Sequence, residues 1–264
     1  MTTDQTGNRY SAAIILAAGK GTRMKSDLPK VMHEAAGRPI VDWVVAAARA
    51  SGIEKIVLVI GHGAELVREF YKDDDDIHWA VQEEQLGTGH AVMSAAGVFD
   101  ADREGDILIL CGDAPLIRSS TLQTLLLKHH QDKAALTMAT SILDDPSGYG
   151  RIIRDANGRL DSIVEDRDAD PQQKAIREIN PGYYCFDGRT LFKSLPLIEN
   201  DNAKGEYYLT DLVGIYREQG RIIDAVDALE PEDVLAVNDR EQLQQVDSIL
   251  RARNGEQLHA EKTA

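Results

Sequence analysis

Short apolar runs alternate with helix-like segments through the first half of this 264-residue chain, and this alternation limits the possible folds more than any other feature. A short apolar run suits a buried strand, whereas apolar residues spaced three and four apart suit an amphipathic helix. Strands that alternate with helices build a parallel sheet with helices on both faces. The expected strands are 12–18, 55–61, 77–82, 106–113 and 134–142, and the expected helices are 39–52, 88–97 and 119–131.

The pattern changes after Tyr149. Two alternating runs in 150–166 flank Asn157 and Gly158, a dipeptide that strongly favours a hairpin turn. We therefore expect an antiparallel insertion in a mostly parallel α/β sheet. Further strands are expected at 178–186 and 221–228, with helices at 206–220 and 240–253.

The charge balance narrows the possible partners. With 29 basic and 44 acidic residues the net charge is −15, which argues against nucleic acid or an anionic membrane as a partner. No apolar run has the length of a membrane span, and the polar first residues lack the apolar core of a signal peptide. Cys111 and Cys185 each lie in an apolar run, so we expect reduced core thiols in a cytoplasmic protein.

A glycine-rich, basic loop follows the first expected strand, in the stretch "LAAGKGTRMKSDLPK" at 16–30. It lacks the third glycine of a dinucleotide-binding fingerprint, and its Gly-Lys pair is not followed by the Ser or Thr of a P-loop. Gly19 and Gly21 can let backbone N–H groups approach phosphate oxygens, and Arg23 and Lys30 supply positive charge. The loop therefore predicts a polyphosphate site of a third kind.

Asp113 directly follows the apolar run "DILILCG" at 106–112, which predicts a buried strand. Open α/β sheets gather their ligands at the carboxyl ends of strands, so this carboxylate is a candidate Mg²⁺ ligand as well as a possible helix cap. Asn238, taken alone, would be the N-cap of the last helix.

Two other polar clusters suggest no chemistry. The acidic run 72–76 lacks the ligand spacing of a calcium loop and predicts a solvated turn. His129 and His130 have no second ligand at metal spacing, which favours capping or surface positions.

Together these motifs resemble the bacterial N-acetylglucosamine-1-phosphate uridyltransferases. Beyond the loop, the stretches "EEQLGTGHA", "GDAPL", "DDPSGYGRI", "IVEDRDA", "EINPG", "GEYYLTD" and "VND" occur in the order and spacing of that family. The resemblance implies a Rossmann-like mixed sheet of the nucleotide-diphospho-sugar transferase type. We expect a disordered segment at 1–11, a nucleotidyltransferase domain at 12–238 with the sugar-binding insertion, and a C-terminal helix and polar tail at 239–264.

The resemblance also assigns roles to residues. Nucleotide contacts are implied for Leu16, Ala17, Ala18, Gly19, Gln82, Gly87, Thr88 and Gly112. Sugar contacts are implied for Gly150, Glu165, Asn180, Tyr208 and Thr210. Arg23 and Lys30 are implied as catalytic cations, and Asp113 and Asn238 as Mg²⁺ ligands completed by phosphate oxygens. Without the resemblance, Gln82 would be a solvent-facing strand end, Glu165 an exposed hairpin acid and Tyr208 a core aromatic.

The implied reaction joins UTP and N-acetylglucosamine 1-phosphate into UDP-N-acetylglucosamine and pyrophosphate. The alternatives are a nucleotidyltransferase for another sugar phosphate or base, and a non-catalytic subunit that binds sugar nucleotides. Two positions depart from the family pattern: Cys111 replaces a common aromatic residue, and Pro181 replaces a small polar one and removes an N–H. These departures make the specificity for the sugar less well determined by the sequence than the specificity for the nucleotide.

Relatives in that family commonly continue into a β-helix of hexapeptide repeats that acetylates glucosamine 1-phosphate and forms trimers. After Arg253 this sequence has eleven polar residues and no such repeat, and we expect them to be frayed. The chain is therefore expected to be monofunctional, and a monomer or weak homodimer.

Overall fold

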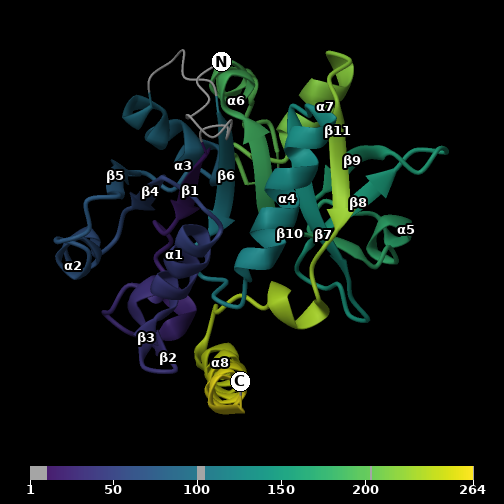
Figure 1. Cartoon of the computed structure of the whole chain (residues 1–264). Helices are drawn as coiled ribbons and strands as arrows, with labels where there is room; N and C mark the ends of the chain where they lie inside the picture. Colours follow the sequence, from purple (N-terminus) through teal and green to yellow (C-terminus); the bar gives the residue numbers. More distant parts are fainter. Residues whose placement is uncertain (1–10, 100–104, 203, 264) are drawn as a thin grey trace.

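The computed structural model describes residues 11–99, 105–202 and 204–263, and these form an α/β fold around one large sheet (Figure 1). The sheet has nine strands, in the order β11-β7-β10-β6-β1-β4-β5, with the β8–β9 hairpin joined to β10. The strands are β1 (Ser11–Leu16), β4 (Lys55–Ile60), β5 (Ile77–Val81), β6 (Asp106–Cys111), β7 (Leu136–Ile142), β8 (Gly150–Arg154), β9 (Leu160–Val164), β10 (Glu178–Asp187) and β11 (Ile223–Asp227). A separate pair joins β2 (Glu34–Ala35) to β3 (Arg38–Pro39).

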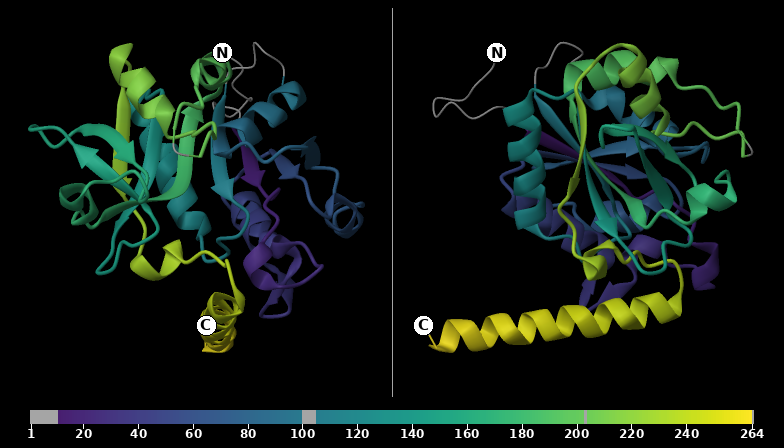
Figure 2. Two further views of the ribbon diagram at one scale, coloured as in Figure 1. Left: turned by 180° about the vertical axis from the view of Figure 1, so that it is seen from behind. Right: turned by 90° about the vertical axis from the view of Figure 1, so that its right-hand side faces the viewer.

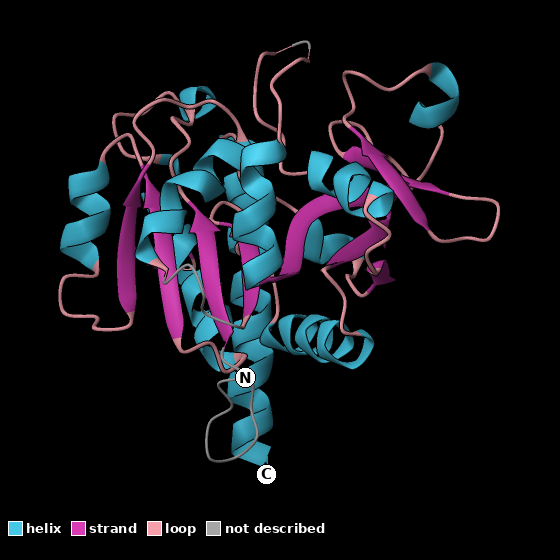
Figure 3. Cartoon of the chain, turned by 90° about the horizontal axis from the view of Figure 1, so that it is seen from above, coloured by secondary structure: helices cyan, strands magenta, loops and turns pink. Residues whose placement is uncertain are grey.

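Helices cover both faces of the sheet, as Figure 3 shows from above. They are α1 (Ile40–Ala50), α2 (Ala64–Phe70), α3 (Thr88–Ala95), α4 (Ser119–Asp132), α5 (Pro171–Lys174), α6 (Gly188–Ser194), α7 (Asp211–Glu218) and α8 (Arg240–Thr263), with short 3₁₀ turns at 22–24, 30–32, 96–98, 195–197 and 231–234. Successive side chains of a strand point to opposite faces. Ala13 and Ile15 therefore pack in the cluster that contains α1, α4 and α8, whereas Ala12 and Ile14 pack with α3, α6 and α7.

The sheet is parallel through β5, β4, β1 and β6, and it turns mixed at β10, which runs antiparallel to both β6 and β7. The hairpin expected around Asn157 and Gly158 is present as β8 and β9, and it pairs with β10. These observations confirm the predicted fold class, a mixed and mostly parallel sheet with a small antiparallel part.

The structure corrects the ends of three predicted segments. Ser11 already belongs to β1, while the rest of the predicted disordered segment, 1–10, lies outside the described residues. The helix expected at 206–220 begins at Asp211, because the backbone before it pairs with another turn of the chain. The last helix does not end near Arg253 but continues to Thr263, and it runs along one end of the molecule beside β2 (Figure 2).

His129 is a further correction. We expected a surface or capping position, but its side chain is fully buried in the last turn of α4. Its Nδ1 lies 3.0 Å from the hydroxyl of Thr137 on β7. The apolar pattern of α4 places this residue toward the sheet, where a hydrogen-bonded imidazole can be buried.

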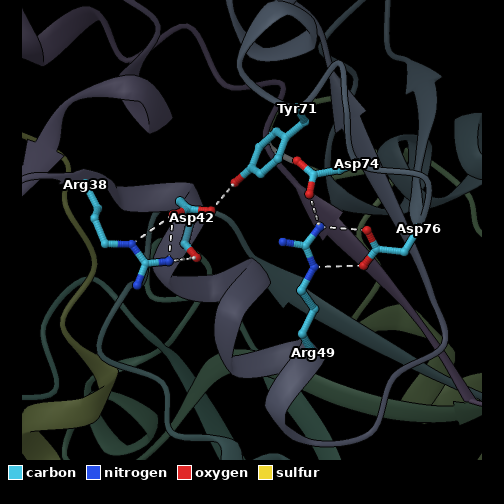
Figure 4. A network of polar contacts seen from close by, with 6 residues as sticks. All are labelled: Arg38, Asp42, Arg49, Tyr71, Asp74 and Asp76. Atoms are coloured by element: carbon cyan, nitrogen blue, oxygen red, sulfur yellow. Dashed lines mark hydrogen bonds and ion pairs between the residues drawn. The ribbon is translucent and has the colours of Figure 1, made fainter.

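The acidic run 72–76 is more than a solvated turn. Asp74 and Asp76 both accept hydrogen bonds from the guanidinium of Arg49 on α1, at 2.9 Å and at 2.6 and 2.8 Å respectively (Figure 4). Next to this group, Tyr71 donates to Asp42, which also pairs with Arg38. Arg49 lowers the pKa of Asp76 below its usual range. The run therefore fastens the loop before β5 to α1.

We expect Arg49→Gln to lower the free energy of unfolding by about 1 kcal/mol without changing catalysis, because these partly exposed ion pairs are screened by solvent. A carboxyl whose pKa is lowered by folding stabilises the protein above its unfolded pKa, and the effect is lost as the pH falls through the folded value. The stability difference between wild type and variant should therefore shrink below about pH 4. Urea unfolding from pH 3 to pH 7 tests this, with Arg251→Gln, in a more exposed pair, as control. A difference that grows in acid would contradict the assignment.

Candidate active site

A cavity of about 330 Å³ opens at the carboxyl ends of β1 and β6. In the sheet, β4 and β5 follow β1 on one side, whereas β6 lies on its other side. The strand order therefore reverses between β1 and β6. Such switch points are where open α/β sheets bind ligands. The cavity is lined by Leu16, Ala17, Ala18, Gly19, Lys30, Val31, Gln82, Gln85, Gly87, Thr88, Ala91, Cys111, Asp113 and Glu206.

Lys30, Asp113 and Asn238 meet at one edge of this cavity. The ammonium of Lys30 forms an ion pair with the Asp113 carboxylate and donates a hydrogen bond to Oδ1 of Asn238 at 3.3 Å. The Lys30 and Asp113 side chains are 12% and 22% exposed, so the charges are largely shielded from solvent yet accessible from the cavity. The structure thus brings together three predicted residues that are far apart in the sequence.

Asn238 reaches this point through a backbone contact. The N–H of Val237 donates to the carbonyl of Asp113 at 2.8 Å, which places the next residue beside the carboxylate. The predicted capping role falls to Asp239, whose side chain accepts from the N–H of Gln242 at 3.0 Å. The Asn238 amide oxygen is directed to Lys30 instead.

The glycine loop bends back on itself between Gly19 and Lys30. Gly21 has φ +59°, and a Cβ added there would lie 2.5 Å from Cβ of Lys30, so only glycine lets the lysine stem cross the loop. From the other side, Arg240 at the start of α8 donates to the carbonyls of Met24 and Lys25. The loop is therefore held at both its turn and its exit. Arg23 lies on this loop with its side chain exposed, outside the cavity lining.

One end of the cavity is organised by two glutamines. Gln82 is 6% exposed, and its side-chain amide donates to the carbonyl of Gly87 at 3.1 Å, which fixes the turn before α3. Gln85 donates to the carbonyl of Ala18 at 2.5 Å and so joins that turn to the end of β1. The burial of Gln82 thus excludes the alternative that this residue is a solvent-facing strand end.

The predicted sugar residues lie together around Glu165. Thr210 is buried, and its hydroxyl lies 3.4 Å from a carboxylate oxygen of Glu165. Burial raises the pKa of Glu165 above its usual range. The pKa of Tyr208 is also raised, mainly by burial and in second place by the nearby Glu206 carboxylate. Asn180 pairs with Gly150 across β10 and β8, and it donates to the hydroxyl of Tyr184 at 2.7 Å. Four separate stretches therefore build one polar region of neutral and acidic groups.

Nine of the predicted residues line the cavity itself. They are Leu16, Ala17, Ala18, Gly19, Lys30, Gln82, Gly87, Thr88 and Asp113. Gly112 lies behind this lining, where its N–H donates to the carbonyl of Leu16 at 3.0 Å. The sugar residues, Asn238 and Arg23 also lie outside the lining.

The sequence reasoning missed five lining residues: Val31, Gln85, Ala91, Cys111 and Glu206. Gln85 lies in the stretch "EEQLGTGHA" and Glu206 in "GEYYLTD", and the polar character of these two residues is the signal that could have indicated them. Cys111 is a correction, because it lines the cavity instead of packing wholly in the core, although it is a free thiol as predicted. Burial, and then the Asp113 charge, raise the pKa of Cys111 to about 12, so the thiol is protonated at neutral pH.

The oxygen donors around Lys30 suit a Mg²⁺ ion. A carboxylate and an amide oxygen converge on one positive charge, and these are ligand types that Mg²⁺ takes together with phosphate oxygens. Among the residues that the structure describes, no cluster of three or more His, Cys, Asp or Glu side chains could hold a metal without such help. The residues present therefore fit an ion shared with a bound triphosphate.

No helix within 11–99, 105–202 and 204–263 is both long and apolar enough to cross a bilayer.

Comparisons with known proteins agree with this geometry. The bifunctional protein GlmU of Geobacter metallireducens is 51% identical over 247 residues, which cover 94% of this chain and 52% of that protein. GlmU of Pelobacter propionicus is 51% identical, and that of Brevibacillus brevis 48%, over 92% and 91% of this chain and 52% of each relative. The chain thus spans about half the length of the curated relatives it matches.

A crystal structure of UDP-glucose pyrophosphorylase complexed with UDP-glucose superposes with a TM-score of 0.74 at 16% identity, covering 92% of this chain and 99% of that one. At this identity the likeness shows a shared fold. The model of the MobA-like NTP transferase domain matches residues 13–179, which hold the glycine loop, every cavity-lining residue except Glu206, and Gly150 and Glu165 of the polar region. This chain therefore belongs to the MobA-like NTP transferase family.

Proposed function

We propose that this chain transfers a uridylyl group from UTP to N-acetylglucosamine 1-phosphate, giving UDP-N-acetylglucosamine and pyrophosphate. The observation that carries the proposal is the meeting of Lys30, Asp113 and Asn238 at the edge of a cavity whose other walls are a glycine loop and a glutamine-lined turn. Membership of an NTP transferase family and the similarity to GlmU proteins support it.

The reaction needs no covalent enzyme intermediate. A phosphate oxygen of the sugar 1-phosphate attacks the α-phosphorus of UTP, and the bond from that phosphorus to the bridging oxygen breaks. Pyrophosphate leaves with the electron pair. The attacking phosphate is already an anion at neutral pH, so catalysis consists of aligning two anions and stabilising the charge that develops.

Each part of the site has a role in this proposal. Backbone N–H groups at Gly19 and Gly21 approach the phosphates, and Lys30 supplies positive charge beside them. Arg23, exposed on the same loop, would complete the charge around the pyrophosphate. Asp113 and Asn238 would hold Mg²⁺, which, when bound, neutralises charge on the α-phosphoryl group and pyrophosphate.

The sugar is proposed to bind between the hairpin and the residues before α7. Glu165, Asn180 and Thr210 offer acceptors and donors for hydroxyl and amide groups, beside the ring of Tyr208. Pro181 lies at an irregularity in the pairing of β10 with β7, between Ile179 and Tyr183, where a missing N–H removes no ladder bond. We therefore expect the sheet to accommodate Pro181, while a sugar contact from a backbone N–H cannot be made at this position.

A panel of nucleotides and sugar 1-phosphates, with pyrophosphate release as readout, tests the proposal. We expect UTP to be used well over CTP, because exchanging a donor for an acceptor beside Gln82 and Gly87 leaves a buried group unpaired, a loss of roughly 1 to 3 kcal/mol. N-acetylglucosamine 1-phosphate should be preferred to glucose 1-phosphate. Equal rates with UTP and CTP would refute the assignment of the nucleotide end, and a preference for another sugar would refute that of the sugar end.

A further inference from the structure

The residues that precede α7, 206–210, lie against the turn at 86–89, which includes Thr88 and Gly89 at the start of α3. Tyr207 donates its N–H to the carbonyl of Leu86 at 2.7 Å and accepts from the N–H of Gly89 at 2.8 Å. Two residues further on, the N–H of Leu209 donates to the hydroxyl of Thr88 at 3.1 Å. Three hydrogen bonds thus fasten one segment to the other.

The close approach depends on two glycines in the turn. A Cβ at Gly87 would lie 2.6 Å from the carbonyl oxygen of Tyr207, and one at Gly89 would lie 2.9 Å from the same atom. Because that oxygen belongs to the backbone, it can move away only if the whole segment moves. Gly89 lies outside the cavity lining, so its lack of a side chain serves the approach of the segment and not a ligand contact.

The fastened segment connects the two ends of the proposed active site. Its first residue, Glu206, lines the cavity beside the turn, and its last, Thr210, bonds Glu165 in the polar region assigned to the sugar. On the other side, Gln82 holds the turn through the carbonyl of Gly87. A displacement of the segment at Tyr207 would therefore shift Tyr208 and Thr210 while leaving Gln82 and the glycine loop in place.

We infer that Gly89 and the hydroxyl of Thr88 are positioning residues for the sugar substrate: they seat the 206–210 segment, which in turn places Tyr208 and Thr210. This inference rests on the proposed function. It gives the Thr88 hydroxyl a structural partner in Leu209 in addition to the nucleotide contact expected for this residue.

The test compares Gly89→Ala with Gly214→Ala. Gly214 lies in α7, the helix that directly follows the segment, and a Cβ added to it would meet nothing within 4 Å. It is therefore a matched control. We expect Gly89→Ala to raise the KM for N-acetylglucosamine 1-phosphate by about tenfold to a hundredfold, the range that a small misplacement of binding groups produces. Its Kd for UTP, measured by calorimetry without sugar, should stay at the wild-type value, and Gly214→Ala should match wild type in both.

A second pair of variants addresses the hydroxyl and also serves if Gly89→Ala does not fold. Thr88→Val removes the acceptor for the N–H of Leu209 and keeps the shape, whereas Thr88→Ser restores the acceptor. We expect the KM for the sugar phosphate to rise in Thr88→Val and to return toward wild type in Thr88→Ser.

The outcomes separate this inference from the function on which it rests. Absence of turnover by the wild-type chain would overturn the proposed function and the inference with it. Normal turnover by wild type, together with an unchanged sugar KM in Gly89→Ala and Thr88→Val, would overturn the inference alone. Weakening of UTP binding by Gly89→Ala to the same degree as binding of the sugar phosphate would also overturn it, because Gly89 lies outside the cavity lining and that result would indicate general damage to the site.

Discussion

Asp113→Asn should lower the turnover number by about a hundredfold to a thousandfold while the protein stays folded. The substitution preserves the shape of the side chain and removes the charge that faces Lys30 across the cavity edge. If Asp113 holds Mg²⁺ with Asn238, the variant should also need more Mg²⁺ to reach its half-maximal rate. Steady-state pyrophosphate release over a range of Mg²⁺ concentrations measures both effects.

Asp132→Asn is the matched control for this variant. Asp132 pairs with Lys128 on α4 and does not line the cavity, so its loss should leave turnover unchanged. Melting temperatures of both variants separate a catalytic defect from unfolding. Near-normal turnover by Asp113→Asn at ordinary Mg²⁺ concentrations would remove Asp113 from the metal site.

Gly21→Ala should cost about a hundredfold in kcat/KM, because it displaces Lys30, the lysine that we propose completes the phosphate site. The new Cβ would meet the Cβ of Lys30 at 2.5 Å, and the residue would be held at φ +59°. Gly37→Ala separates the two causes. Gly37 has φ +81° but nothing within 4 Å of an added Cβ, so that variant carries backbone strain without a clash.

We therefore expect Gly37→Ala to lower the free energy of unfolding by roughly 1 kcal/mol and to keep its activity. If both variants lose activity equally, strain and not the displacement of Lys30 explains the loss. If neither loses activity, the lysine does not need its observed path across the loop.

The sequence was sufficient to predict most of the sheet, for identifiable reasons. The parallel strands β1, β4 and β6 are short apolar runs with both faces buried, so their signal is strong and local. The hairpin was equally clear, because Asn157 and Gly158 favour one kind of turn. Short elements such as α5 and α6 were missed, since a few residues carry too little periodicity to be recognised.

Residues of the candidate site could be predicted where a single local motif contains the functional groups. Gly19, Lys30 and Asp113 stand in recognisable local patterns, at the ends of buried strands or after a glycine loop. The position of Asn238 beside Asp113 depends on a backbone hydrogen bond between Val237 and Asp113, which no local pattern reveals. Only the family resemblance pointed to it.

The 206–210 segment shows how tertiary contacts override local preference. Its residues continue smoothly into the pattern of α7, so the sequence predicts a helix from 206 onward. The N–H groups of Tyr207 and Leu209 bond the turn at 86–89 instead, and a helix starting there would forfeit these bonds. Glu206 enters the cavity as a consequence, and this is why its position could not be predicted from the sequence.

The most direct measurement is a mass balance on the purified chain with UTP, N-acetylglucosamine 1-phosphate and Mg²⁺. Pyrophosphate is followed by an enzyme-coupled assay, and UDP-N-acetylglucosamine by liquid chromatography with mass spectrometry. On the proposed function, both products appear together in equal amounts, neither forms without the sugar phosphate, and Asp113→Asn suppresses both. Tight binding of UTP or of the sugar nucleotide by the wild-type chain, with no formation of either product, would contradict it and would identify a binding protein instead of an enzyme.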